Sequence, residues 1–150
     1  MIARVLCLDR RDICRGPILQ AFLQQRVRPE VKIESAGTFM GLDVESHRGY
    51  PPSPLTLLCM KNNRGIDISG HKSRWAKGLN LNSFHLIVCM TRLELEIFHG
   101  KLPCAVLQAD TLLKEGVALT DAWDQSLLAH EFCASQLEII ADRIFRTYLS

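Results

Sequence analysis

The stretch from residue 9 to residue 16 combines the residue types that bind an anion. It lies between a short apolar run at residues 2–8 and an apolar-periodic segment that starts near residue 17. A strand, a short loop and a helix start, in this order, direct several backbone N–H groups at one small volume, which is typical of a phosphate site. The guanidinium of Arg15 can grip phosphate oxygens in pairs, and Gly16 lets the backbone approach a ligand closely. We therefore predict a phosphate-binding loop formed by Arg10, Arg11, Asp12, Ile13, Cys14, Arg15 and Gly16.

The elements that must position this loop alternate between strand and helix patterns. Apolar or alternating runs predict strands at residues 2–8, 31–35, 84–90 and 105–107. Helical spacing predicts helices at residues 17–27, 54–63, directly after Thr91, and at 127–148. Four strands alternating with helices predict a parallel sheet covered on both faces, and ligands of such sheets bind beyond the carboxyl ends of the strands. The last helix is expected to bury one stripe made of Leu128, Phe132, Leu137, Ile140, Ile144 and Tyr148.

Length and composition narrow the class of protein. The 150 residues suit one domain spanning 1–150, and 47% apolar and 23% charged residues are ordinary for a folded soluble protein. A net charge of +2 argues against binding to nucleic acid or to a membrane surface. The chain has no apolar run long enough to span a bilayer and no secretory signal pattern. Its six cysteines lack C-x-x-C spacing, so we expect reduced thiols in a cytoplasmic protein without a cofactor.

Five sequence segments resemble one known family. In chain order they are I-C-R-G-P, E-S-A-G-T, P-P-S-P, R-G-I-D-I-S-G-H-K-S-R and F-H-L-I-V-C-M-T-R. Together they are similar to the low-molecular-weight protein tyrosine phosphatases. The resemblance implies an α/β fold of three layers, flavodoxin-like (phosphotyrosine phosphatase I-like), with a four-stranded parallel sheet. It also implies phosphotyrosine hydrolysis through a cysteinyl-phosphate, held in a C-x5-R loop and assisted by an aspartate as general acid.

The resemblance breaks at the position of the nucleophile. Counting back from Arg15, the cysteine slot of C-x5-R is Asp9, and Cys7 lies two residues too early for its side chain to reach phosphorus. Cys14 matches the family's second loop cysteine, whose disulfide partner would be the missing nucleophile. The family's general-acid position corresponds to Asp121, which is followed by Ala122 and Trp123 without the usual proline.

Residues that support the loop in the family are partly exchanged. The loop asparagine is replaced by Asp12, and the serine after the loop arginine is replaced by Gly16. Ser35 and His71 match members of the bracing network and are retained. The resemblance therefore implies a loop of similar shape with altered chemistry.

The charge of Asp9 decides what this loop can do. A thiolate is a strong nucleophile at neutral pH, whereas a carboxylate attacks a phosphate dianion poorly unless a metal neutralises the charges. Two unit charges about 4 Å apart at an effective dielectric near 20 interact by roughly 4 kcal/mol, so Asp9 repels a dianion by roughly 8 kcal/mol. We expect the carboxylate of Asp9 to occupy the loop itself, to pair with Arg15 and to cap the following helix.

Alternative readings of the loop remain open. Arg10 and Arg11 could fold inward and restore useful phosphate binding. Asp9 could act as the nucleophile of a phosphomonoesterase, with Asp12 and Asp121 completing a Mg²⁺ site, although isolated structural roles for these carboxylates are the simpler expectation. The fold could also serve as a scaffold or oligomerisation module without a ligand. Arsenate reductases of the same fold need the missing cysteine and rank below these readings.

The loop surroundings offer further candidates. Trp123, Phe39 and Tyr50 could line a cleft of phosphotyrosine size, or could pack over the sheet. His130 and Cys133 stand at i,i+3 on a predicted helix, where we expect a core thiol beside a surface imidazole rather than a metal site. The leading prediction is a phosphatase-like protein without the family's cysteine chemistry. It would act by binding a phosphorylated protein, another anion such as phosphate, or a protein partner at the loop rim.

Overall fold

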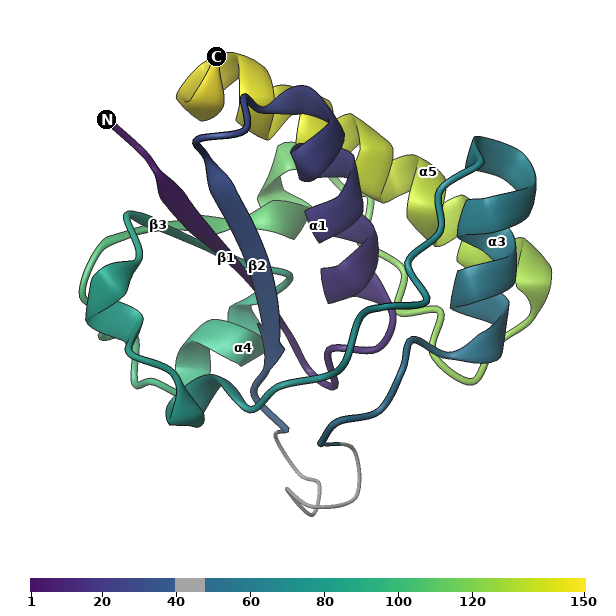
Figure 1. Cartoon of the computed structure of the whole chain (residues 1–150), viewed down its shortest axis with the longest axis horizontal. Coiled ribbons are helices and arrows are strands. Elements are labelled where there is room, and N and C mark those ends of the chain that lie inside the picture. Colours follow the sequence, from purple (N-terminus) through teal and green to yellow (C-terminus); the bar gives the residue numbers. More distant parts are fainter. Residues whose placement is uncertain (40–47) are drawn as a thin grey trace.

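The computed structural model describes residues 1–39 and 48–150 (Figure 1). Its strands are β1 (Arg4–Asp9), β2 (Lys32–Gly37), β3 (Leu86–Cys89) and β4 (Ala105–Gln108). They form one parallel sheet in the order β2-β1-β3-β4. In the register of the sheet, Cys7 lies opposite Ser35 on one side and Val88 on the other. The predicted four-stranded parallel sheet is confirmed.

The helices begin and end at residues that favour helix termini. They are α1 (Arg15–Arg26), α3 (Pro54–Arg64), α4 (Arg92–Glu96) and α5 (Leu127–Ile144), the last continued by a π-helical turn at Phe145–Leu149. Proline is tolerated as the first residue of α3 because its missing N–H has no intrahelical partner there. Gly65 ends this helix with φ of 64°. The hydroxyl of Ser126 caps α5 by accepting a hydrogen bond from the amide of Ala129 at 3.2 Å.

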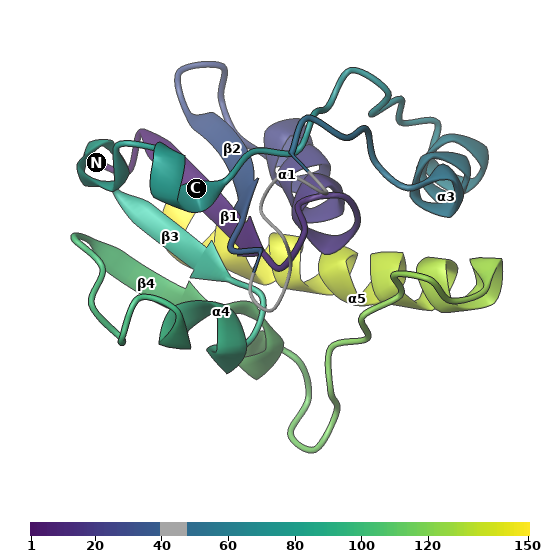
Figure 2. The ribbon, with the colours of Figure 1, turned by 90° about the horizontal axis from the view of Figure 1, so that it is seen from below.

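The sheet is the middle of three layers. Helices α1 and α5 pack on one face, with α3 against α5, and α4 lies on the opposite face together with short 3-10 turns at 76–78 and 81–83 (Figures 1 and 2). Strand β1 serves both layers, since Val5 and Cys7 belong to the core under α1 whereas Leu6 and Leu8 belong to the core under α4. This burial on both faces explains its nearly continuous apolar sequence.

The strand order places the loop after β1 at a switch point of the sheet. From β1 the chain passes through α1 to β2 on one side, and the next strand in sequence, β3, pairs with β1 on the other side. The connections on either side of β1 diverge, which leaves room for a ligand site beyond its carboxyl end. Residues 10–14 occupy this position.

The buried face of α5 differs from the predicted stripe. Leu137, Ile140 and Ile144 are fully buried as expected, but Leu128 is 75% exposed and Phe132 is 56% exposed. Tyr148 is also exposed. The real inner face includes small residues (Cys133, Ala134 and Ala141) that the apolar pattern did not favour. Because α1 packs closely against α5, small side chains fit between the two helices where bulky ones would not.

Within residues 1–39 and 48–150, no helix is both long and apolar enough to cross a bilayer. All six cysteines carry free thiols, and five of them are buried.

Candidate functional site

The end of β2 holds the backbone of the loop that follows β1. The amide of Thr38 donates to the carbonyl of Asp9 at 2.9 Å, and the amide of Phe39 donates to the carbonyl of Arg10 at 2.7 Å. A Cβ atom at Gly37 would lie only 3.0 Å from the carbonyl carbon of Arg11, so a glycine is needed where the strand meets the loop. The path of the loop is therefore set by the neighbouring strand.

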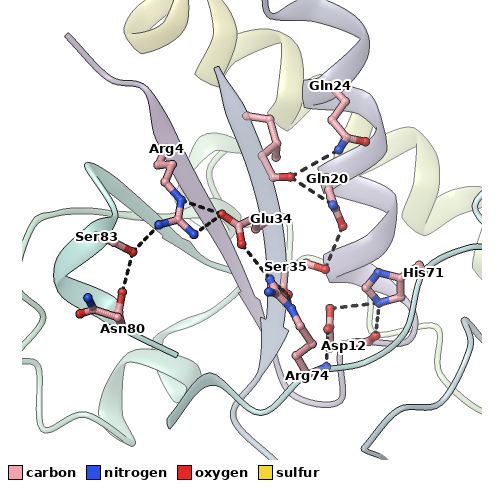
Figure 3. A network of polar contacts seen from close by, with 11 residues as sticks. Arg4, Asp12, Gln20, Gln24, Glu34, Ser35, His71, Arg74, Asn80 and Ser83 are labelled. Carbon is pink, nitrogen blue, oxygen red and sulfur yellow. Dashed lines mark hydrogen bonds and ion pairs between the residues drawn. The ribbon is translucent and has the colours of Figure 1, made fainter. Parts of the chain in front are cut away.

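Asp12 braces the loop from inside the protein. Its φ of 57° lies in the left-handed region, which aspartate adopts more readily than most residues. Its Oδ2 accepts a hydrogen bond from the amide of Arg74 at 3.0 Å (Figure 3). The Nε2 atom of His71 lies 2.8 Å from the carbonyl oxygen of Asp12 and 3.4 Å from its Oδ1. Asp12 is fully buried and faces His71 and Arg74 rather than the loop interior.

Burial and pairing shift the pKa values of this acid and base. Burial raises the pKa of Asp12, although its contact with His71 partly opposes the shift. Burial alone lowers the pKa of His71, but contact with Asp12 outweighs it and raises the pKa overall. Since both groups gain affinity for protons on folding, the pair favours the folded state more strongly at lower pH.

A polar network continues from this brace along β2 (Figure 3). The hydroxyl of Ser35 donates to Gln20 on α1 at 3.0 Å, and Arg74 donates to the carbonyl of Ser35 at 3.1 Å. Arg74 also pairs with Glu34 at 3.3 Å, which in turn pairs with Arg4 at 2.7 Å. Ser35 and His71 thus lie where the sequence predicted bracing residues, and the network includes Arg74, which the sequence analysis did not single out.

The carboxylate of Asp9 fills the interior of the loop. Its Oδ1 accepts from the amide of Arg10 at 2.8 Å and lies 2.8 Å from Nη2 of Arg15. Its Oδ2 accepts from the amide of Gly16, in the first turn of α1, at 3.0 Å. The loop residues, Asp121 and Trp123 line a pocket whose interior is too narrow for a water molecule. The carboxylate of Asp9 therefore bonds two backbone amides of the loop region, those of Arg10 and Gly16, and pairs with Arg15.

Arg15 is shared among three carboxylates. Besides Asp9, its Nη2 lies 3.4 Å from Glu94 and 3.6 Å from Asp121. Glu94 is 2% exposed, and burial raises its pKa. Its second oxygen accepts from the amide of Thr91 at 2.9 Å in a capping box that begins α4. Sequence reasoning missed Glu94 as a loop residue, although the Thr91-x-x-Glu94 spacing does indicate its place at the start of a helix.

The outer rim of the loop combines an arginine, an acid and one aromatic ring. The guanidinium carbon of Arg11 lies 3.7 Å from the ring centroid of Trp123, at cation–π distance. Arg11 also lies 4.0 Å from the half-exposed carboxylate of Asp121. Asp121 and Trp123 are thus brought to the loop, as their matched positions implied.

The other two predicted cleft residues lie elsewhere. Phe39 is 2% exposed, so its ring packs inside the protein, where a φ of 53° turns the chain out of β2. Tyr50 is 49% exposed and does not line the loop pocket. Of the three aromatics, Trp123 is the one that borders the pocket. A pattern of polar loop sequence could not distinguish them, because the direction of each side chain depends on backbone turns.

Asp9, Asp12 and Asp121 do not converge into the carboxylate cluster that the metal-assisted alternative would need. Asp12 is directed at His71 and Arg74, whereas Asp9 and Asp121 share Arg15. Among the residues that the structure describes, no three histidine, cysteine or acidic side chains are grouped so that they could hold a metal ion.

Comparisons of the sequence relate this chain to low-molecular-weight phosphatases. No family model matches the chain. The probable low-molecular-weight protein-tyrosine-phosphatase EpsP of Ralstonia solanacearum is 28% identical over 141 residues, which cover 92% of this chain and 90% of the relative. The EpsP protein of Ralstonia nicotianae is 31% identical over 103 residues, covering 69% of this chain and 66% of the relative.

Solved structures show the same architecture. Vibrio vulnificus Wzb in complex with benzylphosphonate superimposes with a TM-score of 0.81 at 20% identity, covering 97% of this chain and 99% of the other. The tyrosine phosphatase Wzb from Escherichia coli K30, in complex with sulphate, gives 0.80 at 22% identity, covering 95% and 96%.

The strand order and the helices thus define a three-layer, flavodoxin-like α/β protein. The homologues and structural neighbours of this chain are low-molecular-weight protein tyrosine phosphatases.

Proposed function

We propose that this protein is a phosphatase-like binding protein without catalytic activity, whose loop is occupied by its own Asp9. The observation that carries the proposal is the set of contacts of this carboxylate with Arg15 and with the amides of Arg10 and Gly16. These are the donors that a bound phosphate would need. A free ligand must displace a carboxylate that is already bonded and buried, and then face its negative charge.

The contacts of Asp9 also argue against its use as a nucleophile. Nucleophilic attack needs an available lone pair directed at phosphorus, in line with the leaving oxygen. Both oxygens of Asp9 accept hydrogen bonds from the loop backbone, and Oδ1 is also paired with Arg15. No grouped metal ligands accompany it in the described part of the chain, so the charge of a phosphate dianion would not be compensated by a neighbouring cation site.

The rim is the surface through which we propose that the protein binds a partner. Trp123 is half-buried against Arg11, and Asp121 beside them is half-exposed. An aromatic ring flanked by both charge signs suits a protein segment that offers an apolar side chain and polar groups of both signs. A partner at this rim does not need to place a phosphate inside the filled loop.

Phosphate or a phosphorylated protein remains the second candidate ligand, and one observation favours it. The Nε atoms of Arg11 and Arg15 are buried and have no hydrogen-bond partner in the described structure. Buried N–H donors are usually satisfied, so an anion oxygen at the loop mouth would supply a missing acceptor. Such binding would require the Asp9 carboxylate to move.

Two measurements on the whole chain test the proposal. Hydrolysis of para-nitrophenyl phosphate between about pH 5 and 7 is expected to stay at background, with or without Mg²⁺. Turnover that disappears in Asp9→Asn would overturn the claim of inactivity. The melting temperature is expected to be unchanged by millimolar phosphate, vanadate or sulphate in the native chain.

The variant Asp9→Asn removes the competing charge while keeping the shape of the side chain. We expect it to bind phosphate or a phosphotyrosine peptide about tenfold more tightly, or better, because the repulsion between Asp9 and the dianion disappears, although the neutral side chain must still leave the loop amides. Asp142→Asn on α5 is the matched control, since it removes the same charge far from the loop. Fluorescence of Trp123 in a Trp75→Phe background reports binding at the rim. Equal affinity of native chain and Asp9→Asn would show that Asp9 does not occupy the site in solution.

A further inference from the structure

The outer edge of strand β2 is continued by a chain segment near its end and by side chains near its start. Among the described strands only β1 pairs with β2, which is the first strand of the sheet (Figure 1). The amide of Gly37 donates to the carbonyl of Arg74 at 2.8 Å, and Gly37 forms a parallel bridge with Trp75. The end of β2 that is nearest the loop therefore already accepts an extended segment along its edge.

The backbone hydrogen bonds of β2 show which groups face this edge. The amide of Lys32 donates to the carbonyl of Ala3 at 2.8 Å, in the chain that leads into β1. The N–H and C=O groups of successive residues in a strand point to opposite sides, so those of Ile33 and Ser35 point away from β1. A further strand added at the edge would pair with these two residues.

Side chains take the place of such a strand beside the first half of β2. The Nε2 atoms of Gln20 and Gln24 on α1 both donate to the carbonyl of Ile33, at 3.1 and 3.4 Å (Figure 3). Nη2 of Arg74 donates to the carbonyl of Ser35 at 3.1 Å. Gln24 is exposed and Gln20 is half-buried, so both side chains can turn away without a change of the backbone. Natural edge strands are commonly protected against pairing, and at Ile33 this protection consists of two glutamine side chains that a partner can displace.

A groove of about 510 Å³ lies beside this half of β2 and extends to the C-terminal end of α1. Its apolar wall includes Val27 and Val31, which also pack against the core. Ile33 is buried on the face covered by α1, so Lys32 points to the other face, because successive side chains of a strand alternate between the two faces. An extended segment in the groove would therefore place alternate side chains against Val27 and beside Lys32.

The charges around the groove favour acidic side chains in a bound segment. Arg28 and Lys32 are exposed, and neither has an acidic partner in the described part of the chain. Arg4 also lines the groove and is paired with Glu34 at 2.7 Å. Glu30 borders an adjoining hollow together with Arg28. With these three cations against two acids, the rim is positively charged and complements a segment that carries carboxylates.

We propose that the first half of β2 is a docking edge for an extended segment of another protein in which acidic and apolar residues alternate. The segment adds as a further strand beside Ile33, in line with residues 74–75, which already continue the second half of the edge. Its backbone replaces Gln20 and Gln24 as the partner of the Ile33 carbonyl. Main-chain hydrogen bonds supply affinity in this mode of binding, and the alternating side chains supply specificity. The site is separate from the loop rim and does not depend on what the loop holds.

A peptide titration of the full chain, followed by NMR of its ¹⁵N-labelled amides, tests the proposal. The probe is acetyl-Val-Glu-Val-Glu-Val-Glu-Val-amide at neutral pH. We expect the largest amide shifts at residues 31–35, with slower solvent exchange of the Ile33 amide in the bound chain. Shifts that gather at residues 9–16 and Trp123 instead would place the peptide at the loop rim and overturn the proposal, as would the absence of shifts at millimolar peptide.

Two further peptides separate strand pairing from charge. Proline in place of the two inner valines keeps the charge but removes N–H donors and extended geometry, so we expect about tenfold weaker binding. Lysine in place of each glutamate keeps the strand geometry and reverses the charge, and we expect a loss of about tenfold as well. Equal affinity of the proline peptide would exclude pairing with the edge of β2.

Variants of exposed residues test the site from the protein side. Arg28→Glu with Lys32→Glu should weaken binding of the glutamate peptide about tenfold, whereas Lys101→Glu with Lys114→Glu, at exposed cations elsewhere, should leave it unchanged. Gln24→Ala removes a side chain that the peptide must displace and should tighten binding about two- to threefold. Unchanged affinity in a folded Arg28→Glu, Lys32→Glu protein would contradict the proposal.

Light scattering of the free chain distinguishes another occupant of the edge. We expect a monomer whose Ile33 amide becomes protected only when the peptide is added. A dimer that protects this amide without peptide would show that a second copy of the chain occupies the edge, and the proposed partner would then be wrong.

Discussion

Oε1 of Glu94 lies 3.4 Å from Nη2 of Arg15. This contact joins α4 to the start of α1, which packs on the opposite face of the sheet. The guanidinium therefore has a buried acid on its inner side in addition to Asp9, which is 2.8 Å away. An arginine held between two buried carboxylates is well fixed, but little of its positive charge is left for an incoming anion. The weak anion binding that we propose thus has two causes, of which Asp9 is the first and Glu94 the second.

The first prediction concerns Glu94→Gln. The amide oxygen can still accept from Thr91, so we expect the free energy of unfolding in urea to change by about 1 kcal/mol or less. The double variant Asp9→Asn, Glu94→Gln should bind phosphate more tightly than Asp9→Asn alone. Isothermal titration calorimetry measures both affinities. Glu96→Gln on the same helix is the matched control, because Glu96 pairs with the exposed Arg92. If both double variants bind phosphate equally, Glu94 does not restrain Arg15.

The second prediction concerns restoration of the nucleophile. Asp9→Cys should give detectable hydrolysis of para-nitrophenyl phosphate, and Asp9→Cys with Arg15→Lys should return to background. Adding Gly16→Ser alone should help little, since a Cβ at Gly16 would lie 3.2 Å from Oδ1 of Asp12. The triple change Asp9→Cys, Asp12→Asn and Gly16→Ser replaces that crowded charged contact with a neutral one. We expect it to be the most active variant, by about tenfold over Asp9→Cys. Background rates in both would mean that the loop differs in more than its attacking atom.

The third prediction follows from the Asp12–His71 pair. Folding raises the pKa of His71, so its contribution to stability is fully present below about pH 6.5 and is lost as pH rises through the higher folded value. The pKa of Asp12 is also raised, so at lower pH its protonation likewise makes the free energy of unfolding increase as pH falls. Urea unfolding should therefore show a stability that increases as pH falls from about 8 to 6. His71→Gln should flatten this slope and cost about 1–3 kcal/mol near pH 6.

An exposed histidine provides the control for this pH dependence. His99→Gln should leave the slope in place, since His99 lies on the surface. A slope that survives in His71→Gln would assign the pH dependence to another group.

The fourth prediction concerns the inner face of α5. Leu137→Ala removes a fully buried side chain and should cost about 2–5 kcal/mol in urea unfolding. Phe132→Ala removes a larger side chain, but 56% of Phe132 is exposed, so we expect a cost of about 1 kcal/mol or less. Comparable losses in the two variants would contradict the orientation of the helix described above.

Sequence patterns predicted the elements well and side-chain directions less well. The four strands and the long final helix were predictable because apolar periodicity and the proline and glycine positions act locally. The predicted stripe on α5 was wrong in its first half because Leu137 follows Phe132 by five residues, so Leu128 and Phe132 lie on a different face from Leu137, Ile140 and Ile144. Local pattern cannot tell which of two overlapping apolar faces meets α1.

The residues of the candidate site were also predicted from the sequence only in part. The spacing of the matched loop indicated Asp9 and Arg15, and the resemblance to the family's general-acid segment indicated Asp121. In the structure, Arg15 lies within ion-pair distance of both carboxylates. Glu94 was not recognised as a neighbour of the loop, and the expectation of a surface imidazole at His130 was wrong, since its ring is buried. Glu94 lies 79 residues along the chain from Arg15, and only packing decides how the helices that carry these side chains are rotated.

The close approach of Gly37 to the backbone of residues 10–12 has a consequence for how this loop can change its role. Because strand β2 fixes the path of the loop backbone, the loop can fold without a bound ligand. The group that its amides hold can then be either a bound anion or a side chain of the protein, while the surrounding fold stays the same. A change of one side chain at residue 9 can therefore alter what the loop holds without altering how the loop folds.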